Sequence, residues 1–290
     1  MKKKRIIIAV AACVLLIALA VLIVWGNTAL EVTNFTIKSD KIPKAFSGFR
    51  IAQISDLHNA EFGKNNVNLL KMLRGAEPDI IVITGDMVDS RRTDLTVALN
   101  FAKEAVLIAP TYYVTGNHEA NVPAKVYTEF IKGLRSVGVT VLEDQAITIS
   151  RKDDTITLVG VVDPRCDEGF IEGEEREQEG LRMEQKLAAL YQDYKDTYCI
   201  LLSHRPELFD VYVSAELDLV FSGHLHGGQF RIPYLGGLYA PAHGFFPEYD
   251  AGLFTKNGTN MIVSRGLGNS SFPIRINNRP EIIVVELVSQ

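Results

Sequence analysis

The chain has 290 residues, 47% of them hydrophobic, and a formal net charge of −5. About 260 residues follow the apolar N-terminal stretch, which is enough for one large domain with its own core. Four of the 30 Lys and Arg residues lie in the first five positions, so the rest of the chain carries 26 basic against 35 acidic groups. This acidic remainder excludes broad contact with a nucleic-acid backbone, and we expect no nucleic-acid binding.

Residues 6–25 form an apolar run without a charge, long enough to span a bilayer. Because the basic cluster precedes this run, the positive-inside rule predicts a cytoplasmic N-terminus and a domain on the other side of the membrane. We interpret residues 1–28 as an uncleaved single-pass anchor and residues 29–290 as one domain. A cleaved signal peptide is the alternative, since Ala18 and Ala20 have small-x-small spacing.

Three cysteines, Cys13, Cys166 and Cys199, are too few for a zinc–thiolate cluster. Cys13 lies in the apolar run. Cys166 and Cys199 could pair, but the sequence favours two unpaired, mostly buried thiols.

Strands and helices alternate in the first half of the domain. We predict a first, edge strand at 30–38, and then strands at 49–55, 80–84 and 111–115 separated by helices at 65–76 and 93–108. This alternation favours parallel pairing with right-handed crossovers, which brings the carboxyl ends of the strands together.

Strands dominate the second half, so we expect a second sheet packed on the first. A helix is predicted at 123–136, and strands at 139–142, 146–150, 155–162, 197–202 and 217–221. The acidic stretch 167–184 is interpreted as a solvated loop entering a surface helix that continues to residue 194. Beyond residue 234 we expect loops and antiparallel strands, the clearest at 260–264 and 281–288. Residues 234–246 form either an ordered loop or a lip facing the substrate.

Polar groups suited to metal binding follow these strands where they end. Asp56 and His58, two residues apart, point the same way on an extended chain. Asp86 follows a β-branched strand, 80–84, that is predicted to be buried, and it either holds metal or caps the next helix. The other members of this set are Asn117, His118, His204, His224 and His226. Five of the six histidines lie at strand ends, and only His243 stands apart, so we predict a metal site.

The ordered motifs Asp-x-His, Gly-Asp-x-x-Asp, Gly-Asn-His-Glu, a lone His and Gly-His-x-His resemble those of the calcineurin-like metallophosphoesterase superfamily. Residues 203–206, 223–229, 264–268, 273–275 and 279–282 also resemble its bacterial membrane-associated phosphodiesterase group. The resemblance implies an α/β fold, a two-sheet αββα sandwich behind one transmembrane helix. It also implies a location in the bacterial cell membrane with an extracytoplasmic catalytic domain.

Carried over by position, the resemblance implies two divalent ions, Mn, Fe or Zn. Asp56, His58 and His226 would hold the first ion, and Asn117, His204 and His224 the second. Asp86 would bridge both ions, and a metal-bridging hydroxide would attack phosphorus. His118 would protonate the leaving oxygen or stabilise the charge on it, and Asp89 would support the site or cap a helix.

The expected activity is hydrolysis of a phosphodiester or phosphomonoester, from a small molecule or from an envelope or lipid substrate. Arg91, Arg92 and Arg205 either contact the substrate phosphate or form solvated ion pairs. A lipid-precursor pyrophosphatase of the nucleotide-sugar type is a second enzymatic hypothesis. A catalytically silent metal-binding module is a third.

Overall fold

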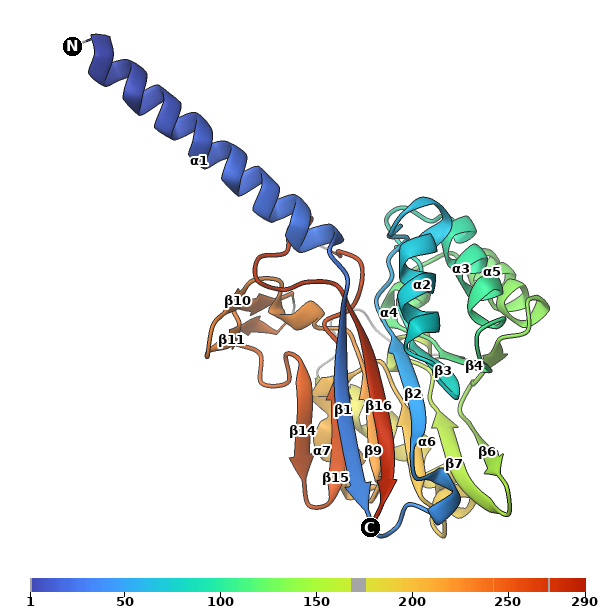
Figure 1. Ribbon diagram of the computed structural model, residues 1–290. Helices are drawn as coiled ribbons and strands as arrows, with labels where there is room; N and C mark the ends of the chain where they lie inside the picture. Colours follow the sequence, from blue (N-terminus) through green and yellow to red (C-terminus); the bar gives the residue numbers. More distant parts are fainter. Residues whose placement is uncertain (1, 168–175, 242, 271) are drawn as a thin grey trace.

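The computed structural model describes residues 2–167, 176–241, 243–270 and 272–290 (Figure 1). Its helices are α1 (Lys2–Thr28), α2 (Val67–Gly75), α3 (Leu95–Ala105), α4 (Asn117–Ala120), α5 (Ala124–Ser136), α6 (Arg176–Tyr194) and α7 (Phe209–Ser214). Its strands are β1 (Glu31–Ser39), β2 (Phe49–Ile54), β3 (Ile80–Thr84), β4 (Thr111–Val114), β5 (Thr140–Val141), β6 (Gln145–Arg151), β7 (Asp154–Gly160), β8 (Cys199–Leu202), β9 (Leu219–Ser222), β10 (Arg231–Ile232), β11 (Gly236–Gly237), β12 (Tyr239–Ala240), β13 (Gly244–Phe245), β14 (Gly252–Lys256), β15 (Thr259–Val263) and β16 (Glu281–Ser289).

Two six-stranded sheets form the domain. The first has the order β1-β16-β2-β3-β4-β5, and the second has the order β14-β15-β9-β8-β7-β6. Strands β2, β3 and β4 are parallel to one another, as the alternating strands and helices predict. β5 extends this parallel set, although the sequence groups residues 139–142 with the strands of the second half. β1 lies at the edge of the first sheet, also as predicted.

The two faces of β3 show how the layers form. Ile81 and Ile83 pack against the helices α2, α3 and α5, whereas Ile80 and Val82 face the other sheet. This alternation follows from the two-residue period of a strand. On the far side, α6 and α7 cover the second sheet through Met183 and other apolar side chains. The result is the αββα sandwich that the sequence indicates.

The prediction for the C-terminal strands is partly wrong. β16 joins the first sheet, between β1 and β2, rather than the second. It runs parallel to β1 and antiparallel to β2, while β15 is parallel to β9. The local pattern of an apolar strand does not specify which sheet it joins or which strands it pairs with. The acidic stretch falls partly outside the described residues, and α6 begins at Arg176.

α1 projects away from the domain (Figure 1) and is long and apolar enough to cross a membrane. Only Ala29 and Leu30 separate it from β1, and Arg279 donates hydrogen bonds to both of their carbonyls. The direction of the strands then decides which end of the domain faces α1. Because β1 is parallel to β16 and β16 is antiparallel to β2, the carboxyl end of β2 lies beside the start of β1.

The cysteines are unpaired, as the sequence favours. Cys199 is buried in β8, and Cys166 is half-buried before the undescribed segment. Burial raises the pKa of both thiols, so neither is an activated nucleophile.

Candidate metal centre

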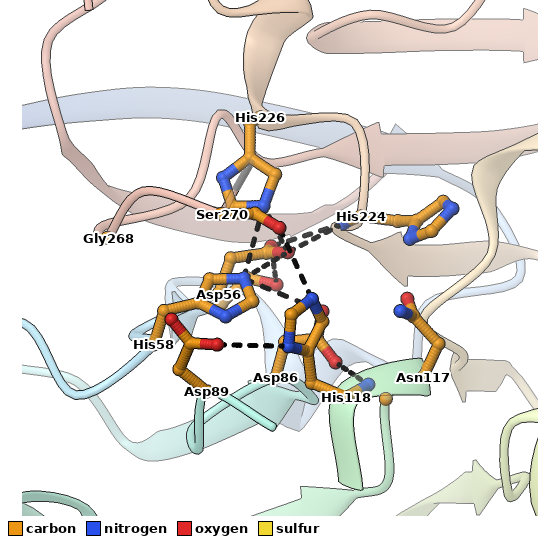
Figure 2. A network of polar contacts seen from close by, with 12 residues as sticks. Asp56, His58, Asp86, Asp89, Asn117, His118, His224, His226, Gly268 and Ser270 are labelled. Carbon is orange, nitrogen blue, oxygen red and sulfur yellow. Dashed lines mark hydrogen bonds and ion pairs between the residues drawn. The ribbon is translucent and has the colours of Figure 1, made fainter. Parts of the chain in front are cut away.

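Seven predicted ligand side chains meet at the carboxyl ends of β2, β3, β4, β8 and β9: Asp56, His58, Asp86, Asn117, His204, His224 and His226. The backbone here is turned, not extended. Asp56 and His58 both have positive φ, +52° and +46°, so the expectation that they share one face of an extended chain is wrong. Each turn instead aims its own side chain inward (Figure 2). Backbone strain of this kind persists only where the surrounding structure enforces it.

Asp86 lies at the centre of the site. Its Oδ1 accepts a hydrogen bond from the backbone of His118 at 2.8 Å, in the first turn of α4. Its Oδ2 faces two imidazoles, His58 Nε2 at 3.6 Å and His204 Nε2 at 3.2 Å. The interpretation that Asp86 caps the next helix is wrong, because Asp94 caps α3. Asp86 Oδ1 instead accepts from the first turn of α4, and Oδ2 faces the candidate metal site.

The first group of ligand atoms comes from β2 and the turn after β9. His58 Nε2 and His226 Nε2 lie 3.1 Å apart, and His226 Nε2 lies 3.5 Å from Asp56 Oδ1. A hydrogen bond from the Ser55 hydroxyl to Asp56 Oδ2 at 2.5 Å fixes the carboxylate. His58 Nε2 lies 3.9 Å from Asp56 Oδ1, and ligand atoms spaced by 3.1–3.9 Å suit one ion at about 2.1 Å from each.

The second group comes from β4, β8 and β9. His204 Nε2 lies 3.1 Å from Asn117 Oδ1, and a ring nitrogen of His224 completes a cluster with His204 and Asp86. The other nitrogen of His204, Nδ1, faces the Thr84 carbonyl at 2.6 Å. A proton on Nδ1 leaves Nε2 free to bind a cation, the arrangement common in protein metal sites.

The electrostatics of the site favour positive charge beside Asp86. Burial lowers the pKa of His58 and of His226 to about 3, so both rings are neutral donors near pH 7. Burial opposes protonation of His204 as well, but Asp86 outweighs it and raises the pKa of that ring to about 10. His204 is therefore protonated near pH 7, and a cation bound beside Asp86 would take the place of that proton. With His204 deprotonated in this way, imidazoles around buried carboxylates form a donor set that fits Mn, Fe or Zn.

His118 lies beside the two groups. Its ring is 4.4 Å from the ring of His58 between centroids, its Nδ1 contacts Ser90, and its Nε2 contacts the Ser270 hydroxyl at 3.2 Å. The ring is thus held from both nitrogens next to the candidate metal site, where it could exchange a proton with a substrate.

Glu119 has a role that sequence reasoning missed. Its buried carboxylate accepts backbone hydrogen bonds from Asp86, Val88 and Gly116, at 2.9, 3.1 and 2.9 Å. Burial, and then Asp86, raise the pKa of this carboxyl to about 7. The Gly-Asn-His-Glu motif was the available signal, since its fourth residue ties the turns after β3 and β4 together.

A loop from Arg265 to Arg279 closes the site from the C-terminal side. Gly268 donates its N–H to the Asp56 carbonyl at 2.7 Å, and Ser270 reaches His118. Arg275 Nη2 lies 3.4 Å from His226 Nδ1 and donates to the Gly268 carbonyl at 2.5 Å. The family-like segments 264–268 and 273–275 thus contact Asp56 and His226, and Ser270, between them, contacts His118.

The expectations for Arg205 and His243 need correction. Arg205 is buried and pairs with Asp163 at 2.6 Å and Glu207 at 3.2 Å, so it does not face a substrate. His243 does not stand apart: its Nε2 lies 3.6 Å from Glu207, and its ring is 5.4 Å from His224. It comes from a loop rather than a strand end, which is why the strand pattern did not place it there.

Asp89 contacts side chains rather than capping a helix. It binds Arg91 at 3.0 Å and Arg92 at 3.2 Å, and it lies 3.6 Å from His118 Nδ1. Asp94 is the residue that caps α3. Arg91 and Arg92 remain largely exposed, so both can still reach a bound phosphate.

The family model described as calcineurin-like phosphoesterase matches residues 49–228, which contain all seven candidate ligands and His118. The chain belongs to this family. It is therefore a metal-dependent phosphoesterase, and its two-sheet fold is that of the family.

Named relatives extend the match beyond that segment. The chain is 29% identical to "Uncharacterized metallophosphoesterase YkuE" of Bacillus subtilis over 90% of this chain and 86% of that protein. It is 30% identical to "Phosphodiesterase YaeI" of Escherichia coli, over 83% and 82%. A "Transmembrane protein with metallophosphoesterase domain" of Danio rerio is 29% identical over 94% of this chain and 61% of its own length. With the apolar α1, such relatives indicate membrane association.

Proposed function

We propose that this phosphoesterase uses two divalent ions, Mn, Fe or Zn, to hydrolyse a phosphate ester. Asp56, His58 and His226 hold the first ion. The second ion is held by Asn117, His204 and His224. The observation that carries this assignment is that Asp86 Oδ2 lies within 3.6 Å of His58 Nε2 and 3.2 Å of His204 Nε2, between the two groups.

When bound, two such ions supply Lewis acidity that activates water and neutralises phosphate charge. The protein residues do the rest. Ser55 and the backbone of His224 hold Asp56 by hydrogen bonds, and Glu119 holds the turn that carries Asp86. These contacts keep the ligand atoms in position before substrate arrives, which lowers the cost of reorganisation.

His118 is assigned the proton transfer to the leaving oxygen. Its ring is buried against His58, and Ser90 and Ser270 contact its two nitrogens. The Ser90 backbone N–H donates to Nδ1, which favours the proton on Nε2, where the Ser270 hydroxyl can accept a hydrogen bond from it. Arg91 and Arg92, exposed beside Asp89, are the candidate contacts for substrate phosphate.

Residues 1–28 are proposed to anchor residues 29–290 to the bacterial cell membrane, with the domain outside the cytoplasm. The basic cluster ahead of the apolar run supports this topology. The two-residue connection between α1 and β1 keeps the domain close to the bilayer. The site lies at the end of β2 that is beside this connection, which favours an amphiphilic or envelope-borne phosphate ester.

The test is turnover of an aryl phosphodiester and the matching monoester by the full chain in detergent. Protein without ions and protein loaded with Mn or Zn would be compared, and bound ions counted. Asp86→Asn is expected to lose turnover by more than about 100-fold together with bound metal, since metal-centred hydrolysis needs the bridging carboxylate. Asp94→Asn, which keeps its cap on α3, is the matched control. Full turnover and two ions in Asp86→Asn would contradict the proposal.

The topology has a separate test. A protease-cleavable tag after Gln290 is expected to be cut by protease added outside intact spheroplasts. Protection of the tag until the membrane is lysed would place the domain in the cytoplasm and favour substrates of that compartment.

A further inference from the structure

Large apolar side chains are exposed together on two short hairpins and on the loop beside them. The β10–β11 hairpin exposes Tyr234 and Leu235 at its tip, and Phe245 and Phe246 lie at the end of the β12–β13 hairpin. We call the hairpin patch this set: Tyr234, Leu235, Phe245, Phe246, Phe272 and Ile276. In the rest of the described domain, exposed large apolar side chains are spread over separate elements, such as Val67 on α2 and Leu253 on β14. A concentration of this kind marks a surface that meets an apolar partner.

The hairpin patch is connected to the end of α1 through the loop that carries Phe272. Phe272 packs on Tyr239 with ring centroids 5.9 Å apart, and Tyr239 packs on Phe245 at 5.3 Å. The loop that carries Phe272 also meets the helix, because Asn269 donates a hydrogen bond to Asn27 at 2.6 Å. The patch therefore continues the surface at which α1 enters the domain (Figure 1).

The orientation of α1 on this loop is fixed by packing. A Cβ placed on Gly26 would lie 2.7 Å from the Arg275 carbonyl oxygen, so the helix backbone and the loop are in close contact. The Arg279 guanidinium lies 4.8 Å from the centre of the Trp25 ring. Trp25 ends the apolar run, and tryptophan at that place marks the boundary between acyl chains and headgroups.

We propose that the hairpin patch inserts into the headgroup and upper acyl region of the same bilayer that α1 spans. The level of Trp25 and the contacts from α1 to the loop bring the patch to this boundary. Its composition, mostly Phe and Tyr with one Leu and one Ile, is that of an interfacial membrane contact. The contact would hold the catalytic domain down on the membrane at a second point besides the helix.

This contact bears on the substrate, and that part of the inference rests on the proposed function. The loop of the hairpin patch also carries Gly268 and Ser270, which contact Asp56 and His118. A phosphate ester on a lipid headgroup would then reach the candidate metal site without leaving the membrane surface. The geometry points to a membrane lipid bearing the phosphate ester as the substrate class.

The test uses the fact that Trp25 is the chain's sole tryptophan. Full-length Trp25→Phe protein would carry either Leu235→Trp or Leu107→Trp, in nanodiscs that hold one copy each. These two leucines are similarly exposed, 66% and 71%. Leu107 follows α3 near Pro110, at the amino ends of the strands and away from the site. It is therefore the matched control.

Lipids brominated at shallow acyl positions are expected to quench Leu235→Trp and to leave Leu107→Trp fluorescent. An unquenched Leu235→Trp would overturn the proposal, and crosslinked dimers at higher protein density would then assign the patch to a second copy. The readout needs no turnover, so it stands whether or not the metal assignments hold. For the substrate class, Leu235→Ser with Phe245→Ser is expected to lower the ratio of lipid-ester to soluble-ester turnover, whereas Leu107→Ser keeps it. An unchanged ratio in the patch variant would overturn the lipid substrate.

Discussion

Asn269 donates a hydrogen bond to Asn27 at 2.6 Å and accepts one from Arg275 Nε at 3.0 Å. Arg275 in turn lies 3.4 Å from His226 Nδ1. The last turn of the membrane helix is thus two side chains away from a candidate metal ligand. The anchor and the site contact the same loop. A substitution at the end of the anchor is therefore expected to alter metal binding at the site.

Removal of the Asn27 side chain is expected to weaken metal binding. Asn27→Ala takes one partner from Asn269, which loosens Arg275 and the ring of His226. Loss of one neutral hydrogen bond predicts an increase of about three- to tenfold in the Mn dissociation constant, measured by calorimetry in nanodiscs. Thr28→Ala is the control, because its hydroxyl bonds only within α1, to the Val24 carbonyl. Equal Mn affinities in the two variants would show that the Asn27 side chain does not affect metal binding.

The loss of turnover on substitution of His118 is expected to depend on how much the leaving group needs protonation. If this ring protonates the departing oxygen, His118→Ala lowers turnover of an alkyl phosphodiester by about 10²–10⁴-fold. A nitrophenyl ester needs little protonation and should lose far less. Turnover of the two esters by wild type and variant, at equal metal content, provides the measurement. Equal losses on both esters would instead assign His118 a purely structural role.

Gly116 is expected to tolerate no side chain. A Cβ there would lie 2.6 Å from the Asp86 nitrogen and closer still to its carboxylate oxygen. Gly116→Ala must displace the candidate bridging residue, and we expect loss of bound metal with a destabilisation of about 1–3 kcal/mol. Gly75→Ala in α2 meets no atom within 4 Å and serves as the control. Metal counting and urea unfolding check both, and normal metal content in Gly116→Ala would refute the steric argument.

The buried pair of Asp163 and Arg205 is expected to stabilise the domain at neutral pH. Burial by itself would raise the pKa of Asp163, but the Arg205 guanidinium outweighs it and lowers the pKa below its usual range. Asp163→Ala leaves a buried guanidinium short of a partner, at a cost of about 3–5 kcal/mol. Urea unfolding of the wild-type and Asp163→Ala chains in detergent at pH 7 measures this loss of unfolding free energy.

The sign of the pH dependence follows from that lowered pKa. A folded-state pKa below the unfolded value, about 3.9, gives stabilisation that is present above that pH. It is lost as the pH falls toward the folded-state pKa. The difference in unfolding free energy between wild type and Asp163→Ala should therefore narrow below about pH 4. A difference that stays constant into acid would show that Asp163 does not act through its charge.

The sequence predicted the strands that carry the site because their signals are local. Residues 80–84 are β-branched throughout and carry no charge, and a run of this kind is expected to be buried on both faces. Alternation with helices then implies parallel strands, whose ends meet at one edge. The polar residues that follow each strand end, such as Asp86 and Asn117, could be grouped on that ground alone.

Contacts between distant segments could not be predicted in this way. β16 inserts between β1 and β2, and His243 reaches Glu207 from a loop. Arg205 follows a strand end in the sequence, where a substrate-binding arginine could lie. In the fold its guanidinium forms a buried ion pair with Asp163. None of these contacts follows from the hydrophobic periodicity or the motif spacing of the sequence. Each depends on which surfaces come together when the sheets pack.

From the sequence alone we can predict the apolar helix, the alternation of the first sheet and the residue types suited to metal. These follow from hydrophobic burial and backbone periodicity, which act over a few neighbouring residues. Only the tertiary structure decided that Asp86 lies between two groups of imidazoles, and that the end of α1 is tied to the loop beside them. One of those relations joins residues 242 positions apart, Asn27 and Asn269, and no local pattern encodes such contacts.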